Sequence, residues 1–144
     1  MGNRRQAREL ALQALYLYDT CSMPVDKALE TVMAAGDHAN ISGFCRHIVE
    51  GVHSRKQEID DILSKYTENW NIKRMASVDR NILRISAFEI LTDTETPVSV
   101  IIDEAIEIAK IYSTADSRKF VNGILDKIKI ERKPGGKPDL PPAE

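Results

Sequence analysis

One side of the first twenty residues combines arginines with an aromatic ring. At about 100 degrees per residue, Arg5, Arg8, Leu12 and Tyr16 form one stripe of a helix. Guanidinium groups pair with phosphates and a flat ring offers a base a stacking surface, as single-stranded nucleic acid requires. The same stripe also suits a helix that packs Leu12 and Tyr16 on a neighbour and leaves its arginines solvated. The residues alone therefore leave a nucleic-acid contact and a packing face both open.

A second group of this kind lies near the end of the chain. Asp116, Lys119 and Phe120 fall on one flank of the core stripe of the last predicted helix, with Gly123 beside them. A basic residue and an aromatic residue again occur together. Taken alone, such a group is more often the edge of a hydrophobic core than a ligand site.

Motifs for catalysis or metal binding are missing from the sequence. His38, His47 and His53 have no partner at i,i+4, and Cys45-x-His47 is a single weak coincidence. The sequence contains no P-loop, GxSxG, GxGxxG or HExxH motif. We therefore expect no enzyme activity, no cofactor and no metal site.

The carboxylates are expected to be structural. Asp103, Glu104 and Glu107 are predicted to lie on the solvated face of an amphipathic helix. Glu89 instead falls on an apolar side of its predicted helix. Because a buried charge needs a partner, Glu89 is expected to pair with an arginine or to hydrogen-bond another helix end.

Size and charge limit the class of protein. A chain of 144 residues is expected to form one domain and can bury a sizeable core without a metal or disulfide. Twenty basic residues against 22 acidic ones give a net charge of −2, which argues against a protein that coats nucleic acid non-specifically. Cys21 and Cys45 form no CxxC pair, and no secretory signal or apolar stretch of about 18 residues occurs, so a cytoplasmic protein is expected.

The hydrophobic pattern is helical nearly throughout, which predicts an all-α fold. The first helix should begin at Asn3 as N-cap and end at Asp19, and the last should begin at a capping box of Ser113 and Asp116 and end near residue 128. The other predicted helices cover residues 25–35, 41–65 (one helix or two joined near Ser54), 78–91 and 98–112.

Three further segments have distinct compositions. Residues 78–91 are apolar almost all round, so this helix should be central. Trp70 and Ile72 are expected to plug the core from an irregular stretch. The domain should span residues 1–131, because residues 132–144 are rich in proline and glycine and are expected to form a disordered tail.

Three blocks of sequence resemble the NusB family. They are RRQARELALQALY near the start, VDRNILRISAFEIL in the middle, and ETPVSVIIDEAIEIAKIYSTADSRKFVNGILDKI towards the end. The resemblance covers essentially residues 3–130. It implies an all-α, single-domain helical bundle of about seven helices arranged in two packed helical subdomains.

The resemblance also implies a function without catalysis. Members of this family bind the boxA element, a short single-stranded RNA sequence in the leaders of ribosomal RNA operons. They do so together with NusE, the ribosomal protein S-ten. With other Nus factors and RNA polymerase, the complex suppresses premature transcription termination.

The site residues follow from this resemblance by position. The implied RNA-binding residues are Arg4, Arg5, Arg8, Gln13 and Tyr16 near the N-terminus, and Tyr112, Asp116, Lys119 and Phe120 near the C-terminus. The implied partner-binding residues, around the NusE contact, are Asp79, Arg80 and Arg84. The sequence departs from the family at Gln6, which interrupts a run of arginines that is denser in other members. The expected electrostatic attraction to RNA is therefore weaker.

Three alternatives remain at this point. The chain could be a protein-interaction scaffold, for example a homodimer that hides its arginine face. It could be an RNA-binding domain related to that of rRNA cytosine methyltransferases, which would require a further catalytic domain. A helix-turn-helix DNA binder is disfavoured, because no short turn followed by a polar recognition helix is present and the net charge is negative.

Overall fold

The computed structural model describes residues 2–36, 38–67 and 72–132, and it confirms the all-α prediction. These residues form seven α-helices and two short 3-10 helices, without a strand. Their bounds are α1 (Gly2–Cys21), α2 (Val25–Met33), α3 (Ser42–Ser54), α4 (Lys56–Tyr66), η1 (Ile72–Arg74), α5 (Ser77–Thr92), α6 (Val98–Tyr112), α7 (Ala115–Ile128) and η2 (Lys129–Glu131). Within the described residues, no helix is both long and apolar enough to span a bilayer.

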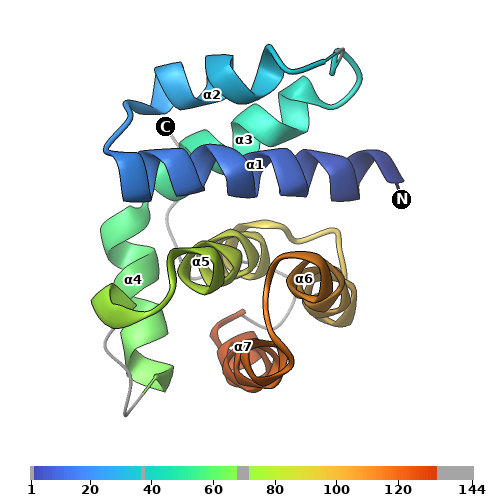
Figure 1. The fold of residues 1–144 in the computed structure, drawn as a ribbon. Helices are drawn as coiled ribbons and strands as arrows, with labels where there is room; N and C mark the ends of the chain where they lie inside the picture. The colour runs from blue at the N-terminus through green and yellow to red at the C-terminus, as the bar shows by residue number, and fades with distance from the viewer. Residues whose placement is uncertain (1, 37, 68–71, 133–144) are drawn as a thin grey trace.

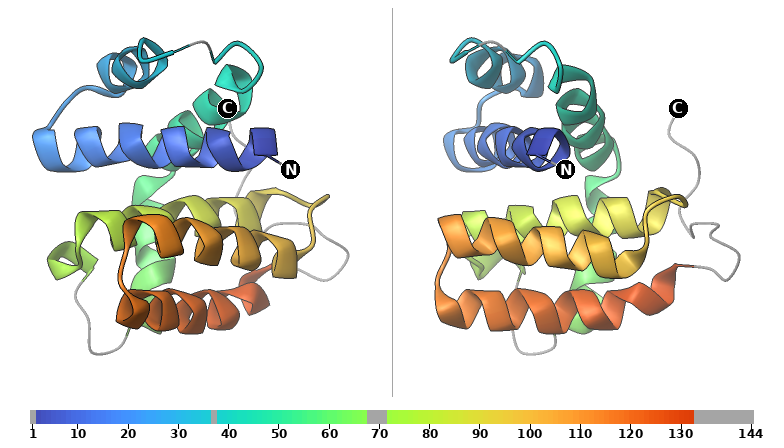
Figure 2. Two further views of the ribbon diagram at one scale, coloured as in Figure 1. Left: turned by 45° about the vertical axis from the view of Figure 1, so that its right-hand side comes forward. Right: turned by 90° about the vertical axis from the view of Figure 1, so that its right-hand side faces the viewer.

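The helices form two packed groups, as expected (Figure 1). In the first group α1, α2 and α3 contact one another, and in the second α5, α6 and α7 do so, with α4 against α5 and α7. Helix α1 lies across α5 and α6 and joins the two groups (Figure 2). The two predicted subdomains therefore share one continuous core.

Helix α5 is the centre of the bundle, in agreement with its apolar sequence. It contacts α1, α3, α4, α6 and α7, and every residue from 81 to 91 is buried. Gly51 of α3 permits one of these contacts, because a Cβ atom there would lie 2.2 Å from Cζ of Phe88. The close approach of α3 to α5 therefore depends on a residue without a side chain at this position.

Helix α1 is buried from two directions. Its alanine stripe, Ala7, Ala11 and Ala14, is inaccessible to solvent. Arg8 and Leu12 face α5 and α6 and are only 5% and 3% exposed. The packing interpretation is thus correct for Leu12, and the expectation of a solvated Arg8 is wrong, because a second layer of helices covers this side of α1.

Residues 41–65 form two helices that meet at Arg55, which confirms the alternative of two helices joined near Ser54. Other helix ends differ from the predictions by one or two residues. Asn3 lies inside α1 rather than capping it. The N-cap of α7 is Thr114, whose Oγ1 accepts a hydrogen bond from the Ser117 amide at 3.1 Å. The predicted capping box of Ser113 and Asp116 is therefore wrong, and the hydroxyl of Ser113 instead donates to Asp79.

Two expectations fall partly outside the described residues. Trp70 is not among them, whereas Ile72 is buried as expected. Residues 133–144 of the predicted tail are also outside them. Arg132, the first residue of that segment, is described, and its guanidinium donates to the backbone carbonyls of Ile90 at 2.7 Å and Thr96 at 2.8 Å. Arg132 therefore contacts the end of α5 and the connection that leads to α6.

Candidate nucleic-acid interface

The first arginines of α1 lie at the edge of the molecule. Arg4 is exposed, and its guanidinium carbon lies 4.4 Å from the centroid of the Phe44 ring in α3. Such a cation–π contact restrains the side chain without removing its charge. Arg5 is half-buried and donates two hydrogen bonds to Glu104 of α6, at 2.8 and 2.9 Å. Arg4 thus keeps its charge available, whereas much of the hydrogen-bonding capacity of Arg5 is used within the protein.

Arg8 is a structural residue in this arrangement. It donates two hydrogen bonds of 2.8 Å to the carboxylate of Glu89 in α5. A further nitrogen of Arg8 lies 3.8 Å from Glu104. The prediction that Glu89 pairs with an arginine is confirmed. Its partner is Arg8, which had been expected to face solvent.

Glu104 also differs from its prediction. It was expected on the solvated face of its helix, together with Asp103 and Glu107, but it is buried. The hydrogen bond from Arg5 holds the pKa of Glu104 below its ordinary value, the charges of Arg5 and Arg8 act in the same direction, and burial opposes them. The carboxylate of Glu104 therefore links α6 to α1 through Arg5 and Arg8.

The remaining predicted residues of α1, and Tyr112 of α6, are open to solvent. Gln13 is exposed, and Tyr16 is 39% exposed. Tyr112, the last residue of α6, is 36% exposed. Such partial exposure leaves one part of each tyrosine packed and the rest available to a stacking base.

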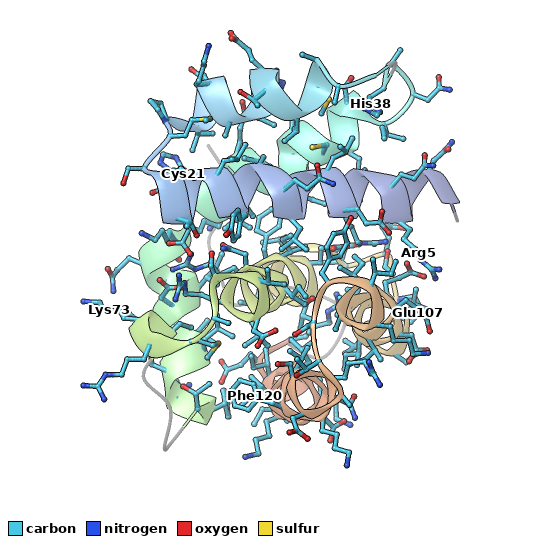
Figure 3. The ribbon with its side chains drawn as sticks, in the orientation of Figure 1. Arg5, Cys21, His38, Lys73, Glu107 and Phe120 are labelled. Atoms are coloured by element: carbon cyan, nitrogen blue, oxygen red, sulfur yellow. The ribbon has the colours of Figure 1, made fainter. Side chains whose placement is uncertain are left out.

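The three predicted residues of α7 do not share one environment. Asp116 and Lys119 are exposed, whereas Phe120 is half-buried and packs against the hydrophobic core. In Figure 3, Phe120 lies on the side of α7 that faces α4, away from Arg5 and Glu107. Lys119 and Phe120 therefore lie on different sides of α7.

An open groove of about 710 Å³ runs between α6 and α7 and reaches α1. It is lined by Arg5, Asp103, Glu104, Ile106, Glu107, Lys110, Arg118, Lys119 and Asn122. Glu104 is paired with Arg5, and Glu107 with Lys110 at 2.9 Å. The side chains of Arg118 and Lys119 form no hydrogen bond or ion pair with the described residues, so the unpaired groove charges are two cations against Asp103.

Sequence reasoning missed part of this groove. Arg118 and Asn122 line it, yet neither is among the residues implied by the family resemblance. The signal was the adjacent cationic pair Arg118-Lys119, followed one turn later by Asn122. Periodicity gives these residues a shared neighbourhood on α7, but only the packing of α6 beside α7 makes it concave.

The predicted partner-binding residues of α5 are engaged within the chain. Arg80 binds Asp19 of α1 at 2.6 Å and also the backbone carbonyl of Met75. Arg84 donates to both oxygens of Asp60 in α4, at 2.9 and 3.0 Å. Asp79 accepts hydrogen bonds from two serine hydroxyls. These side chains connect α5 to its neighbours, with little of their surface left for a second protein.

Asp19 is the acidic centre of this second network. Burial alone would raise its pKa, but the hydrogen bond from Arg80 and the charges of Arg84 and Arg80 outweigh burial and lower it. The carboxylate is therefore ionised when it ties the end of α1 to α5.

Two of the histidines, His47 and His53, lie in aromatic contacts. His47 packs near Phe44 and Phe88, and His53 meets the ring of Tyr18 edge-on. Among the described residues, no three histidine, cysteine, aspartate or glutamate side chains are arranged to hold a metal ion.

Comparison with known sequences identifies one family over almost the whole chain. Residues 5–129 match the profile of the NusB family. A transcription antitermination protein NusB from Elusimicrobium minutum (strain Pei191) is 48% identical over 138 residues, which cover 94% of this chain and 99% of that protein. One of the same name from Geobacillus kaustophilus (strain HTA426) is 44% identical over 126 residues, with coverage of 88% and 95%.

Solved structures agree with these matches. The structure of T. maritima NusB superimposes with a TM-score of 0.83 at 38% identity, covering 92% of this chain and 94% of that one. A crystal structure of the antitermination factors NusB and NusE in complex with dsRNA has the same fold, with a TM-score of 0.80 at 24% identity and coverage of 90% and 98%.

Proposed function

Because the chain belongs to the NusB family, we propose that it is a transcription antitermination factor that binds boxA RNA of nascent transcripts, notably those of rRNA operons, together with NusE. It acts in the cytoplasm in a larger complex with other Nus factors and RNA polymerase, and it catalyses no reaction. The two relatives that cover 94% and 88% of the chain both carry the name transcription antitermination protein.

The observation that carries the RNA part of this proposal is the groove between α6 and α7. It brings Arg5 from α1 and Lys119 from α7, two residues that the family resemblance implies for RNA binding, to one concave surface. Arg118 and Asn122 extend it along α7. A phosphodiester backbone suits this groove, because the unpaired cations outnumber the unpaired carboxylate and an amide adds a neutral donor.

We assign the exposed members of the predicted set to RNA contact and the buried ones to support. Arg4, Gln13, Tyr16, Tyr112, Asp116 and Lys119 are exposed, and Arg5 and Phe120 are partly so. Arg8 supports them through Glu89. Two or three phosphate contacts give a shallow salt dependence, with a slope of about −0.7 per contact for a single strand. RNA binding by the chain alone is therefore modest, and a partner that adds contacts increases it.

NusE is the proposed partner, at the N-terminal half of α5, where Asp79, Arg80 and Arg84 lie. We propose that these residues shape the surface for NusE through their bonds to α1, α4 and α7, since most of their polar atoms are occupied. Support comes from a NusB of the same fold that has been crystallised with NusE and dsRNA.

The test is a titration of the protein with boxA RNA and with a scrambled RNA, with and without NusE, over a range of salt concentrations. Tighter binding of boxA that increases with NusE is expected. Lys119→Gln should weaken binding and reduce the magnitude of the salt slope by about 0.7. Lys127→Gln is the matched control, because Lys127 is exposed on the same helix but does not line the groove.

Two results would contradict the proposal. Equal affinity for boxA and scrambled RNA in the presence of NusE would exclude the boxA assignment. Equal effects of Lys119→Gln and Lys127→Gln would exclude the groove as the RNA surface.

A further inference from the structure

A single carboxylate connects three helices on the side where α6 ends and α7 begins. Asp79 lies in the first turn of α5 and is only 7% exposed. Its Oδ1 accepts a hydrogen bond from the hydroxyl of Ser113 at 2.5 Å, and its Oδ2 accepts one from the hydroxyl of Ser117 at 2.7 Å. Both oxygens are therefore used, and hydrogen bonds to a charged acceptor are among the stronger ones in proteins.

The two serines occupy the connection between α6 and α7. Ser113 directly follows α6, and its amide donates to the carbonyl of Ala109 at 2.8 Å. Ser117 lies in the first turn of α7, and its amide donates to Oγ1 of the N-cap residue Thr114. Asp79 thus fixes the end of one helix and the first turn of the next against α5.

The segments held in this way carry proposed RNA-binding side chains. Tyr112 precedes Ser113, and Asp116 and Lys119 flank Ser117 in the chain. The rotation of the first turn of α7 decides whether Arg118 and Lys119 line the groove, since both lie within two residues of Ser117. We propose that Asp79 is a positioning residue for RNA binding, which acts through Ser113 and Ser117 rather than by touching RNA or a partner protein. This inference rests on the proposed RNA-binding function.

Direct contact between Asp79 and a partner protein is the competing role, and it follows from the family resemblance. The geometry disfavours it, because a donor from a partner would have to displace a serine hydroxyl from a carboxylate that is almost inaccessible. Among the described residues, no arginine or lysine forms an ion pair with Asp79, so the hydroxyls are its main partners.

The first test measures, without RNA, whether the hydrogen bonds from Ser113 and Ser117 to Asp79 hold the first turn of α7. Amide hydrogen exchange in the first turn of α7 should accelerate in Asp79→Asn and in the milder variant Ser117→Ala. It should stay close to the unchanged protein in Ser117→Thr, which retains a hydroxyl. Equal exchange rates in all four proteins would overturn the proposal.

The second test is a double-mutant cycle on boxA affinity in the presence of NusE. The compared quantity is the factor by which Lys119→Gln weakens boxA binding. If Asp79 positions Lys119, this factor should be at least about threefold smaller in the Asp79→Asn background than in the unchanged protein. Arg4→Gln, on α1, should lose the same factor in both backgrounds. Strict additivity for both pairs would overturn the positioning role. Failure of the unchanged protein to prefer boxA would instead overturn the proposed function, and the exchange experiment would still decide whether Asp79 holds α7.

Discussion

Arg8 in α1 and Glu89 in α5 form a buried, two-pronged ion pair with N–O distances of 2.8 Å in each prong. Their side chains are 6% and 4% exposed. The pair joins the two groups of helices, and Arg5 with Glu104 forms a second connection beside it. The polar side of α1 is thus an inter-helix contact for part of its length and an exposed surface at its ends.

Removing one member of this pair should destabilise the protein. Glu89→Ala leaves the guanidinium of Arg8 buried without its main partner, which typically costs about 3–5 kcal/mol. We expect a correspondingly lower free energy of unfolding in urea, followed by circular dichroism. Arg8→Ala should behave similarly, because it leaves the carboxylate of Glu89 buried without its arginine.

A surface pair provides the control for this prediction. Arg46 and Glu50 form an exposed i,i+4 pair at 3.2 Å, so Arg46→Ala should change stability by less than about 1 kcal/mol. The combination Arg8→Met with Glu89→Leu should recover much of the loss, because neither member of the pair is then left buried without its partner. If Glu89→Ala and Arg46→Ala unfold at the same urea concentration, the buried pair does not hold the helix groups together.

The pairing of Glu89 could be predicted from sequence, whereas the role of Arg8 could not. A carboxylate on an apolar side of a helix requires a partner wherever the helix packs, so one residue was sufficient for the inference. Helical periodicity places Arg8 and Leu12 on a common face, but it does not say whether a second layer covers that face. Periodicity likewise predicted a solvated Glu104, because it does not show that α1 packs against α6. The groove beside Arg118 likewise arises only from tertiary packing.

Stability should fall in acid because of Glu104. Its pKa in the folded protein lies below the ordinary value of 4.5, first because Arg5 donates hydrogen bonds to it. The unfolded chain therefore binds the proton more readily than the folded one, and the stabilisation is complete above about pH 5. It is lost as the pH falls through the ordinary value towards the depressed folded one, and Asp19 contributes with the same sign.

Urea unfolding between pH 3 and pH 7 measures this effect. Glu104→Gln should be less stable than the unchanged protein at pH 7, and the difference should shrink as the pH falls below about 5. Glu30→Gln is the control, because Glu30 is exposed on α2. A difference between Glu104→Gln and the unchanged protein that is constant across this range would show that ionisation of Glu104 does not stabilise the fold.

The two cysteines should differ in reactivity. Cys21 is exposed at the end of α1, whereas Cys45 is buried and burial raises the pKa of its thiol to about 11. Since the thiolate is the reactive form, iodoacetamide at pH 8 should modify Cys21 first. Mass spectrometry of the native protein should show one added group, and a second only in urea. Rapid modification of Cys45 in the native protein would mean that α3 opens readily.

A pair of glycines should respond oppositely to the same substitution. Gly51→Ala places a Cβ atom 2.2 Å from Cζ of Phe88, whose ring is fully buried, so the ring or α3 must move. Overpacking of this kind typically costs about 1–3 kcal/mol. A Cβ atom at Gly123 in α7 meets nothing within 4 Å, so Gly123→Ala should stabilise the helix by about 0.5–1 kcal/mol. Thermal unfolding should therefore move in opposite directions for the two variants, and a parallel shift would contradict the close approach of α3 to α5.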